Sequence, residues 1–103
     1  MSTNAIIKLE GFKAAQLYKH WDGYPSATLP WLQKFNKEFT EKRGDDSSYK
    51  FAQLIRSSVS MSTEFELDDS EETGWGVLSA SEKVRAHFEY RLLKDGTVTV
   101  KEI

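Results

Sequence analysis

The sequence predicts a single α+β domain in which two helices pack on one face of a four- or five-stranded, mainly antiparallel sheet. Strand-like alternation at both ends of the chain encloses a middle segment with helical spacing. The chain has 103 residues, which is the size of one domain. Aromatic residues make up 13% of it and bury a large area each, so a short chain can build a compact core. We expect one domain over residues 1–103 with the order β-β-α-α-β-β-β.

Two strands are expected first, at residues 4–10 and 14–21, and Gly11 separates them. In the second strand, alternation places His20 and Trp21 on opposite faces of the sheet. An Asp-Gly turn follows the strand.

Two helices are expected at residues 28–43 and 46–60. Thr28 can cap the first helix, and Lys42 and Arg43 place positive charge at the negative end of its dipole. Apolar residues recur at helical spacing in both segments. The expected buried faces comprise Leu32, Phe35 and Phe39 in the first helix, and Phe51, Leu54 and Ile55 in the second.

The last part of the chain shows strand patterns at residues 74–78, 84–93 and 97–103, with a hairpin signal between the last two. Residues 61–67 alternate as well, with one acidic face. The predicted core consists of Ile7, Leu17, Trp21, Leu32, Phe35, Phe39, Phe51, Leu54, Ile55, Val77, Phe88, Tyr90, Leu92, Val98 and Val100.

Composition excludes several classes of function. The chain has no cysteine, which rules out disulfides, thiol catalysis and thiolate zinc sites. Its two histidines, His20 and His87, have no metal-ligand spacing, and no nucleophile elbow or phosphate-binding glycine loop is present. We therefore expect no metal, no cofactor and no enzymatic activity. No apolar run reaches the roughly 20 residues of a membrane span, and no signal peptide is visible, so we expect a cytoplasmic protein.

The densest group of chemically versatile side chains lies around the Asp-Gly turn. Its candidate binding residues are His20, Trp21, Asp22 and Tyr24. An imidazole, a carboxylate and two aromatic rings can bind a base, a sugar or a partner side chain. The simpler interpretation, which we favour, is a structural turn with aromatic residues packed beside it.

A second candidate is acidic. Residues 57–82 contain no Lys or Arg, and their candidate interaction surface comprises Glu64, Glu66, Asp68, Asp69, Glu71 and Glu72. Such a surface can bind a basic partner in a salt-sensitive manner. A solvated loop is the interpretation that we favour.

Direct binding of nucleic acid is weakly supported. Nine cations lie within the first 56 residues, against six carboxylates, yet the net formal charge of the chain is −2 and no nucleic-acid motif is present. These cations are Lys8, Lys13, Lys19, Lys34, Lys37, Lys42, Arg43, Lys50 and Arg56.

The stretch Leu17-Tyr18-Lys19-His20-Trp21-Asp22-Gly23-Tyr24-Pro25 resembles a family of small bacterial and phage proteins without an assigned function. Members carry a Tyr-Arg-His/Gln-aromatic-Asp-Gly-Tyr-Pro signature, then a helix, an Ala-Gln-Leu-Ile-like segment (residues 52–55 here) and a Tyr-rich hairpin. Lys19 stands where Arg is more usual, which would weaken a bidentate contact. The resemblance implies a prokaryotic or phage source and supports the fold, but it implies no reaction.

The sequence thus favours a non-catalytic module that acts through contacts with another protein. The alternatives are a small-ligand or single-stranded nucleic-acid binder at the His20–Tyr24 edge and, less favoured, a small enzyme. The pattern does not define the oligomeric state, because a terminal strand can leave an edge open for pairing.

Overall fold

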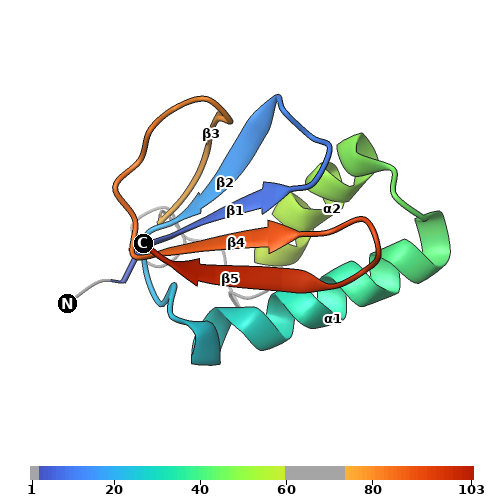
Figure 1. The fold of residues 1–103 in the computed structure, drawn as a ribbon, viewed down its shortest axis with the longest axis horizontal. Coiled ribbons are helices and arrows are strands. Elements are labelled where there is room, and N and C mark those ends of the chain that lie inside the picture. The colour runs from blue at the N-terminus through green and yellow to red at the C-terminus, as the bar shows by residue number, and fades with distance from the viewer. Residues whose placement is uncertain (1–2, 60–73) are drawn as a thin grey trace.

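Five strands and two helices follow one another in the expected order (Figure 1). The structure is a computed structural model, and it describes residues 3–59 and 74–103. The elements are β1 (Ala5–Leu9), β2 (Ala15–Lys19), α1 (Pro25–Arg43), α2 (Ser47–Val59), β3 (Trp75–Ser79), β4 (Phe88–Leu92) and β5 (Val98–Glu102). The α+β class and the order of elements are therefore confirmed.

The strands form one mixed sheet in the order β3-β2-β1-β4-β5. The central strand β1 is antiparallel to β2, where Ile7 lies opposite Leu17, and parallel to β4, where Ile7 lies opposite Tyr90. The pairs β2–β3 and β4–β5 are antiparallel. The parallel pair arises because the chain leaves β2, builds both helices and β3, and only then returns to the other side of β1.

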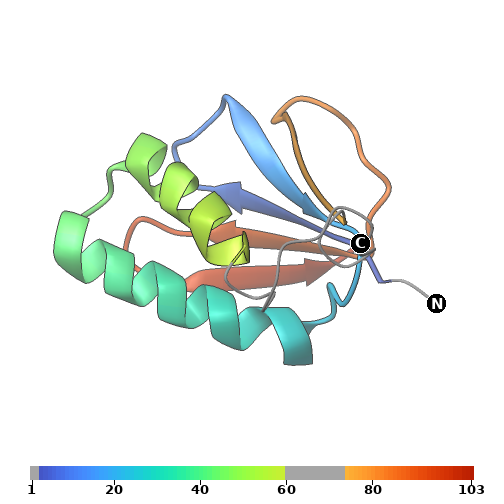
Figure 2. The ribbon, with the colours of Figure 1, turned by 180° about the vertical axis from the view of Figure 1, so that it is seen from behind.

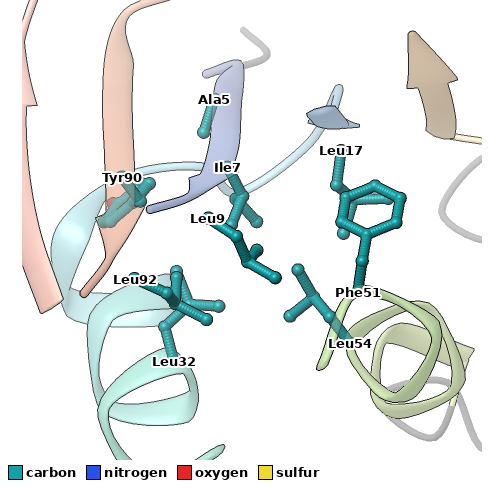
Figure 3. Packing of buried hydrophobic residues seen from close by; sticks show 9 residues of the cluster. All are labelled: Ala5, Ile7, Leu9, Leu17, Leu32, Phe51, Leu54, Tyr90 and Leu92. Atoms are coloured by element: carbon teal, nitrogen blue, oxygen red, sulfur yellow. The ribbon is translucent and has the colours of Figure 1, made fainter. Parts of the chain in front are cut away.

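Both helices cover the same face of the sheet (Figure 2). Alternation along the strands directs small and aliphatic side chains, with Tyr90, to that face. Leu32 of α1 and Phe51 and Leu54 of α2 pack against them (Figure 3). Leu32 and Leu54 are fully buried, and each contributes about 1.5–3 kcal/mol through burial.

The connection from β3 to β4, residues 80–87, has to pass β2 and β1 to reach its position in the sheet. Gln16 points away from the helices and holds this connection, because its amide donates to the carbonyls of Ser79 (2.9 Å) and Glu82 (3.0 Å). Ile6, on the same face, is buried as well. The sheet is thus protected on its second face near β1.

Three predicted boundaries were wrong. The second strand ends at Lys19, two residues before the expected end. The first helix begins at Pro25 because the proline occupies its first position, where a missing amide hydrogen costs nothing, so Thr28 is not its cap. The strand expected over residues 84–93 is limited to Phe88–Leu92. The strand expected at residues 61–67 lies outside the described residues.

Two predicted core residues, Val77 and Val100, are exposed by 53% and 39%. Their partners Leu17 and Tyr90 are buried, so both valines point toward the helix side. They are exposed because β3 and β5 are the two edges of the sheet. Trp21 is half-buried and does not belong to the main cluster of buried residues.

Candidate functional site

The sequence-predicted site at the end of β2 is a turn in which His20 and Trp21 come together. Because β2 ends at Lys19, these two residues no longer alternate across a sheet. Their rings meet edge to face, with centroids 4.7 Å apart and planes at 85°. The expectation that they lie on opposite faces was therefore wrong.

The next three residues, Asp22, Gly23 and Tyr24, use their backbones to build the turn and begin α1. Asp22 has a φ of 53°, a left-handed conformation that aspartate tolerates better than most residues, and its carbonyl accepts the Thr28 hydroxyl (2.8 Å). The Gly23 carbonyl accepts the buried Tyr90 hydroxyl (2.6 Å). The Tyr24 carbonyl accepts the first amides of α1. These backbone groups have structural roles, while the side chains of Asp22 and Tyr24 are exposed.

His20 belongs to a hydrogen-bonded chain that the sequence did not predict. The side-chain amide of Asn4 donates to the Tyr18 hydroxyl (3.0 Å), and that hydroxyl lies 2.8 Å from Nδ1 of His20. The Asn4 backbone amide donates to Nδ1 of His87 (3.2 Å). Because a backbone N–H can only donate, Nδ1 of His87 acts as an acceptor. The Tyr18 hydroxyl can donate to Nδ1 of His20 or accept from it.

The alternation of β2 offered one signal for this cluster, since Tyr18 and His20 are two residues apart and share a side. No such signal exists in the sequence for Asn4 and His87, because only the pairing of β1 with β4 brings these two residues together. Over residues 3–59 and 74–103, the side-chain hydrogen bonds of both imidazoles go to Asn4 and Tyr18, not to a carboxylate or a serine. The same ranges contain no group of three or more metal-ligating side chains.

A second candidate site is a groove of about 510 Å³ between the two helices. Each helix contributes residues spaced three or four apart, which lie along one of its faces. The Arg43 guanidinium lies 4.5 Å from the centre of the Tyr49 ring, and the Phe35 and Phe39 rings stack with centroids 6.2 Å apart. The groove is lined by Phe35, Glu38, Phe39, Lys42, Arg43, Tyr49, Gln53, Arg56 and Ser57.

The groove combines aromatic surface with positive charge. Tyr49 is 56% exposed, whereas tyrosine side chains are usually at least half-buried. Three cations and one carboxylate give the lining a net formal charge of +2. Sequence reasoning placed both helices on one face of the sheet and counted Lys42, Arg43 and Arg56 among the candidate cations. It missed this site because it did not predict which side chains of the two helices face one another.

A third polar cluster lies inside the fold. Lys50 is 3% exposed, and its ammonium donates to the Asn36 side-chain oxygen (2.6 Å) and to the Thr40 hydroxyl (3.4 Å). Burial lowers the pKa of Lys50 from 10.5, and the charges of Asp45, Glu10 and Asp95 raise it in part.

Lys19 is buried too, with its ammonium 4.4 Å from the centre of the Trp75 ring. Two of the nine cations considered for nucleic-acid binding, Lys19 and Lys50, are thus buried inside the domain. The acidic candidate surface, Glu64, Glu66, Asp68, Asp69, Glu71 and Glu72, lies outside the described residues.

Comparison with protein-family models, curated proteins and solved structures gives no match. The resemblance to the bacterial and phage family therefore stays a prediction. Over the two described ranges, neither helix has the combination of length and hydrophobicity that a membrane-spanning helix requires.

Proposed function

We propose that this domain is a non-catalytic binding module that recognises another protein through the groove between α1 and α2. The observation that carries the proposal is the exposed Tyr49 ring in a groove that is also lined by Phe35 and two arginines. Aromatic residues and arginine dominate the binding energy of protein interfaces. Two parallel ridges of side chains with a groove between them suit an inserted peptide segment.

The chemistry of both candidate sites supports binding in preference to catalysis. The groove lining contains neither histidine nor cysteine, and the Ser57 hydroxyl accepts the Trp31 indole N–H (2.7 Å). At the other site, Tyr18 and Asn4 hold both imidazoles by Nδ1. A nucleophile paired with a base, the usual sign of covalent catalysis, is found at neither place within the described ranges. The absence of cysteine suits a reducing compartment, so the proposal places the module in the cytoplasm.

Matched variants test this proposal. Tyr49→Ala/Arg56→Ala removes exposed groove side chains, and Thr99→Ala/Lys101→Ala changes exposed residues of β5 as a control. Partners captured by the wild-type domain are identified by mass spectrometry, purified and titrated against each folded variant. We expect the groove variant to bind about tenfold more weakly or worse and the control to match the wild type. Equal affinities for all three proteins would contradict the proposal.

A small-ligand site at the His20 turn is a second candidate. Its support is the Asn4–Tyr18–His20 chain, which holds the imidazole at Nδ1 while the imidazole ring contacts the Trp21 ring. Amide shifts recorded while nucleotides, sugars and oligo(dT) are titrated would then change at residues 18–24 and 87. Loss of those shifts in His20→Ala/Trp21→Ala would support this site, whereas an unchanged spectrum across the panel would rule out those ligand classes.

A further inference from the structure

We infer that the groove between α1 and α2 binds an acidic segment of its partner, which places one aromatic or aliphatic side chain against Phe35 and Tyr49. The carboxylates of that segment would pair with Lys42, Arg43 and Arg56. This inference rests on the proposed function and names the chemistry of the partner.

The cations of the groove are available for a ligand. In the part of the chain that the structure describes, the ion pairs within 4 Å join Glu89 to Lys8 and to Arg91, and none involves a groove cation. Arg43 lies over the Tyr49 ring, and Arg56 donates to the Gln53 side-chain oxygen at a long 3.4 Å. Three cations in one groove, with no carboxylate partner among the described residues, attract a ligand with several negative charges.

The position of Arg43 favours a carboxylate in particular. A guanidinium stacked on an aromatic face keeps its N–H groups free along its edge, where they can bind both oxygens of one carboxylate. Arg56 approaches from the other helix. A segment between them can therefore be held from both sides by charge-assisted hydrogen bonds.

The aromatic rings of the groove favour a ligand that has an apolar side chain as well as negative charge. Phe35 and Phe39 stack within the groove, and Tyr49 exposes more than half of its surface. An apolar side chain that covers these rings removes their surface from water, which favours binding by about 25 cal/mol per Å². An acidic segment with one large apolar residue satisfies both requirements, whereas an inorganic anion satisfies only the first.

The surrounding charges disfavour nucleic acid as the ligand. Glu38 lines the groove, and Asp45 and Asp46 follow Arg43 and Gly44 in the connection between the helices. A phosphate backbone that continued past the groove at this end would meet these carboxylates. Nucleic-acid surfaces need a more extended positive field, and the chain as a whole carries a net formal charge of −2.

Selection from a library of random short peptides displayed on phage tests the inference without a known partner. We expect the enriched peptides to carry several Asp or Glu residues around one Trp, Phe or Leu. A synthetic peptide of the enriched sequence is then titrated by fluorescence anisotropy. Arg43→Glu/Arg56→Glu should weaken its binding at least about tenfold, and added NaCl should weaken it in the wild type.

The control variant is Lys13→Glu/Lys83→Glu, which makes the same change in net charge at two exposed lysines outside the groove lining. Its affinity should match that of the wild type, and circular dichroism must show that each variant is folded. Equal weakening in the control would overturn the inference, because the charge effect would then be general.

Further outcomes separate the inference from the proposed function. Neutral or basic peptides that bind the wild type but not Tyr49→Ala/Arg56→Ala would overturn the inference and leave the proposed function standing. Failure to enrich any peptide that is sensitive to the groove variants would overturn both. Displacement of a bound acidic peptide by oligo(dT) at equal concentration would overturn the inference in favour of nucleic acid.

Discussion

Gly23 shows how closely the turn after β2 packs on β1. A Cβ at this position would lie 2.8 Å from the Ala5 Cβ and 2.8 Å from the Asn4 carbonyl carbon. We predict that Gly23→Ala destabilises the domain by about 1–3 kcal/mol, because the backbone of the turn or of β1 must shift. Urea unfolding monitored by tryptophan fluorescence measures this change.

Gly76→Ala is the matched control, because among the described residues its Cβ would meet only the Tyr18 Cβ, at 4.0 Å. We expect it to leave stability unchanged or to raise it by up to about 1 kcal/mol, since glycine inside a strand is unfavourable. If both alanine variants unfolded at the same urea concentration, close packing at Gly23 would not be the reason for the glycine.

The turn itself was predictable from the sequence, but its contacts were not. The Asp22-Gly23 pair is a local signal, and local chemistry produces the turn. The hydroxyls that hold it come from Thr28 in α1 and Tyr90 in β4, and only the folded chain brings Tyr90 there. The contact between His20 and Trp21 was missed for a related reason, because the strand ends where pairing with β1 and β3 ends, not where alternation stops.

Among the elements, α1, α2 and the β4–β5 hairpin are joined through one buried side chain. The Asn36 amide donates to the carbonyls of Leu93 (3.0 Å) and Thr97 (2.8 Å), and its oxygen accepts from Lys50 (2.6 Å). Asn36 is fully buried. It therefore fixes the hairpin on α1 and provides a partner for the buried ammonium of α2.

We predict that Asn36→Ala lowers the free energy of unfolding by about 2–4 kcal/mol. The two carbonyls keep their bonds within the hairpin, but the hairpin loses its connection to α1 and the buried Lys50 loses its shorter bond. Lys37→Ala, an exposed substitution on the same helix, should change stability by less than about 0.5 kcal/mol. Hydrogen exchange should also accelerate at Gly96 and Thr97 in Asn36→Ala alone, and unchanged exchange there would argue against this role.

Helical spacing predicted the two helices, but it did not predict their buried polar residues. The helical spacing correctly predicted that Leu32, Phe51 and Leu54 are buried. Apolar residues at this spacing lie along one face of a helix, and that face packs against the core. Asn36 and Lys50 occupy equally buried positions, yet polar residues are normally exposed and their burial depends on partners from other elements. The groove between the helices was missed for the same reason, since its lining combines residues from both.

At the scale of the whole molecule, the topology decided which predictions failed. The hairpin signal between the last two strands correctly indicated the antiparallel pairing of β4 with β5. The parallel pairing of β1 with β4 has no local signal, because it depends on where the chain returns after the helices. The same topology places β3 and β5 at the edges, which is why Val77 and Val100 are exposed despite alternating correctly.

The dependence of global stability on alkaline pH follows from Tyr90, which is fully buried beneath α1 and bonded to the Gly23 carbonyl. Burial raises the pKa of Tyr90 to about 12, and a hydrogen bond with Thr28 offsets part of that rise. In the unfolded chain its pKa is about 10. Below pH 10 the hydroxyl is protonated in both the folded and the unfolded state, so its contribution to the free energy of unfolding is fully present. Above pH 10 the unfolded state loses the proton first, and stability falls until the pH passes about 12.

We predict that Tyr90→Phe is less stable than the wild type by about 1–2 kcal/mol at pH 8, because the Gly23 carbonyl loses its buried donor. At pH 11 this difference in stability should shrink by about 1.4 kcal/mol. Only the wild type has a hydroxyl that ionises more easily in the unfolded state, so only the wild type loses stability by this route. Lys50 is present in both proteins, so its own titration cancels in the difference. Urea unfolding of both proteins at the two pH values measures the gap. A gap of the same size at pH 11 would mean that Tyr90 ionises as easily in the folded domain as in the unfolded chain.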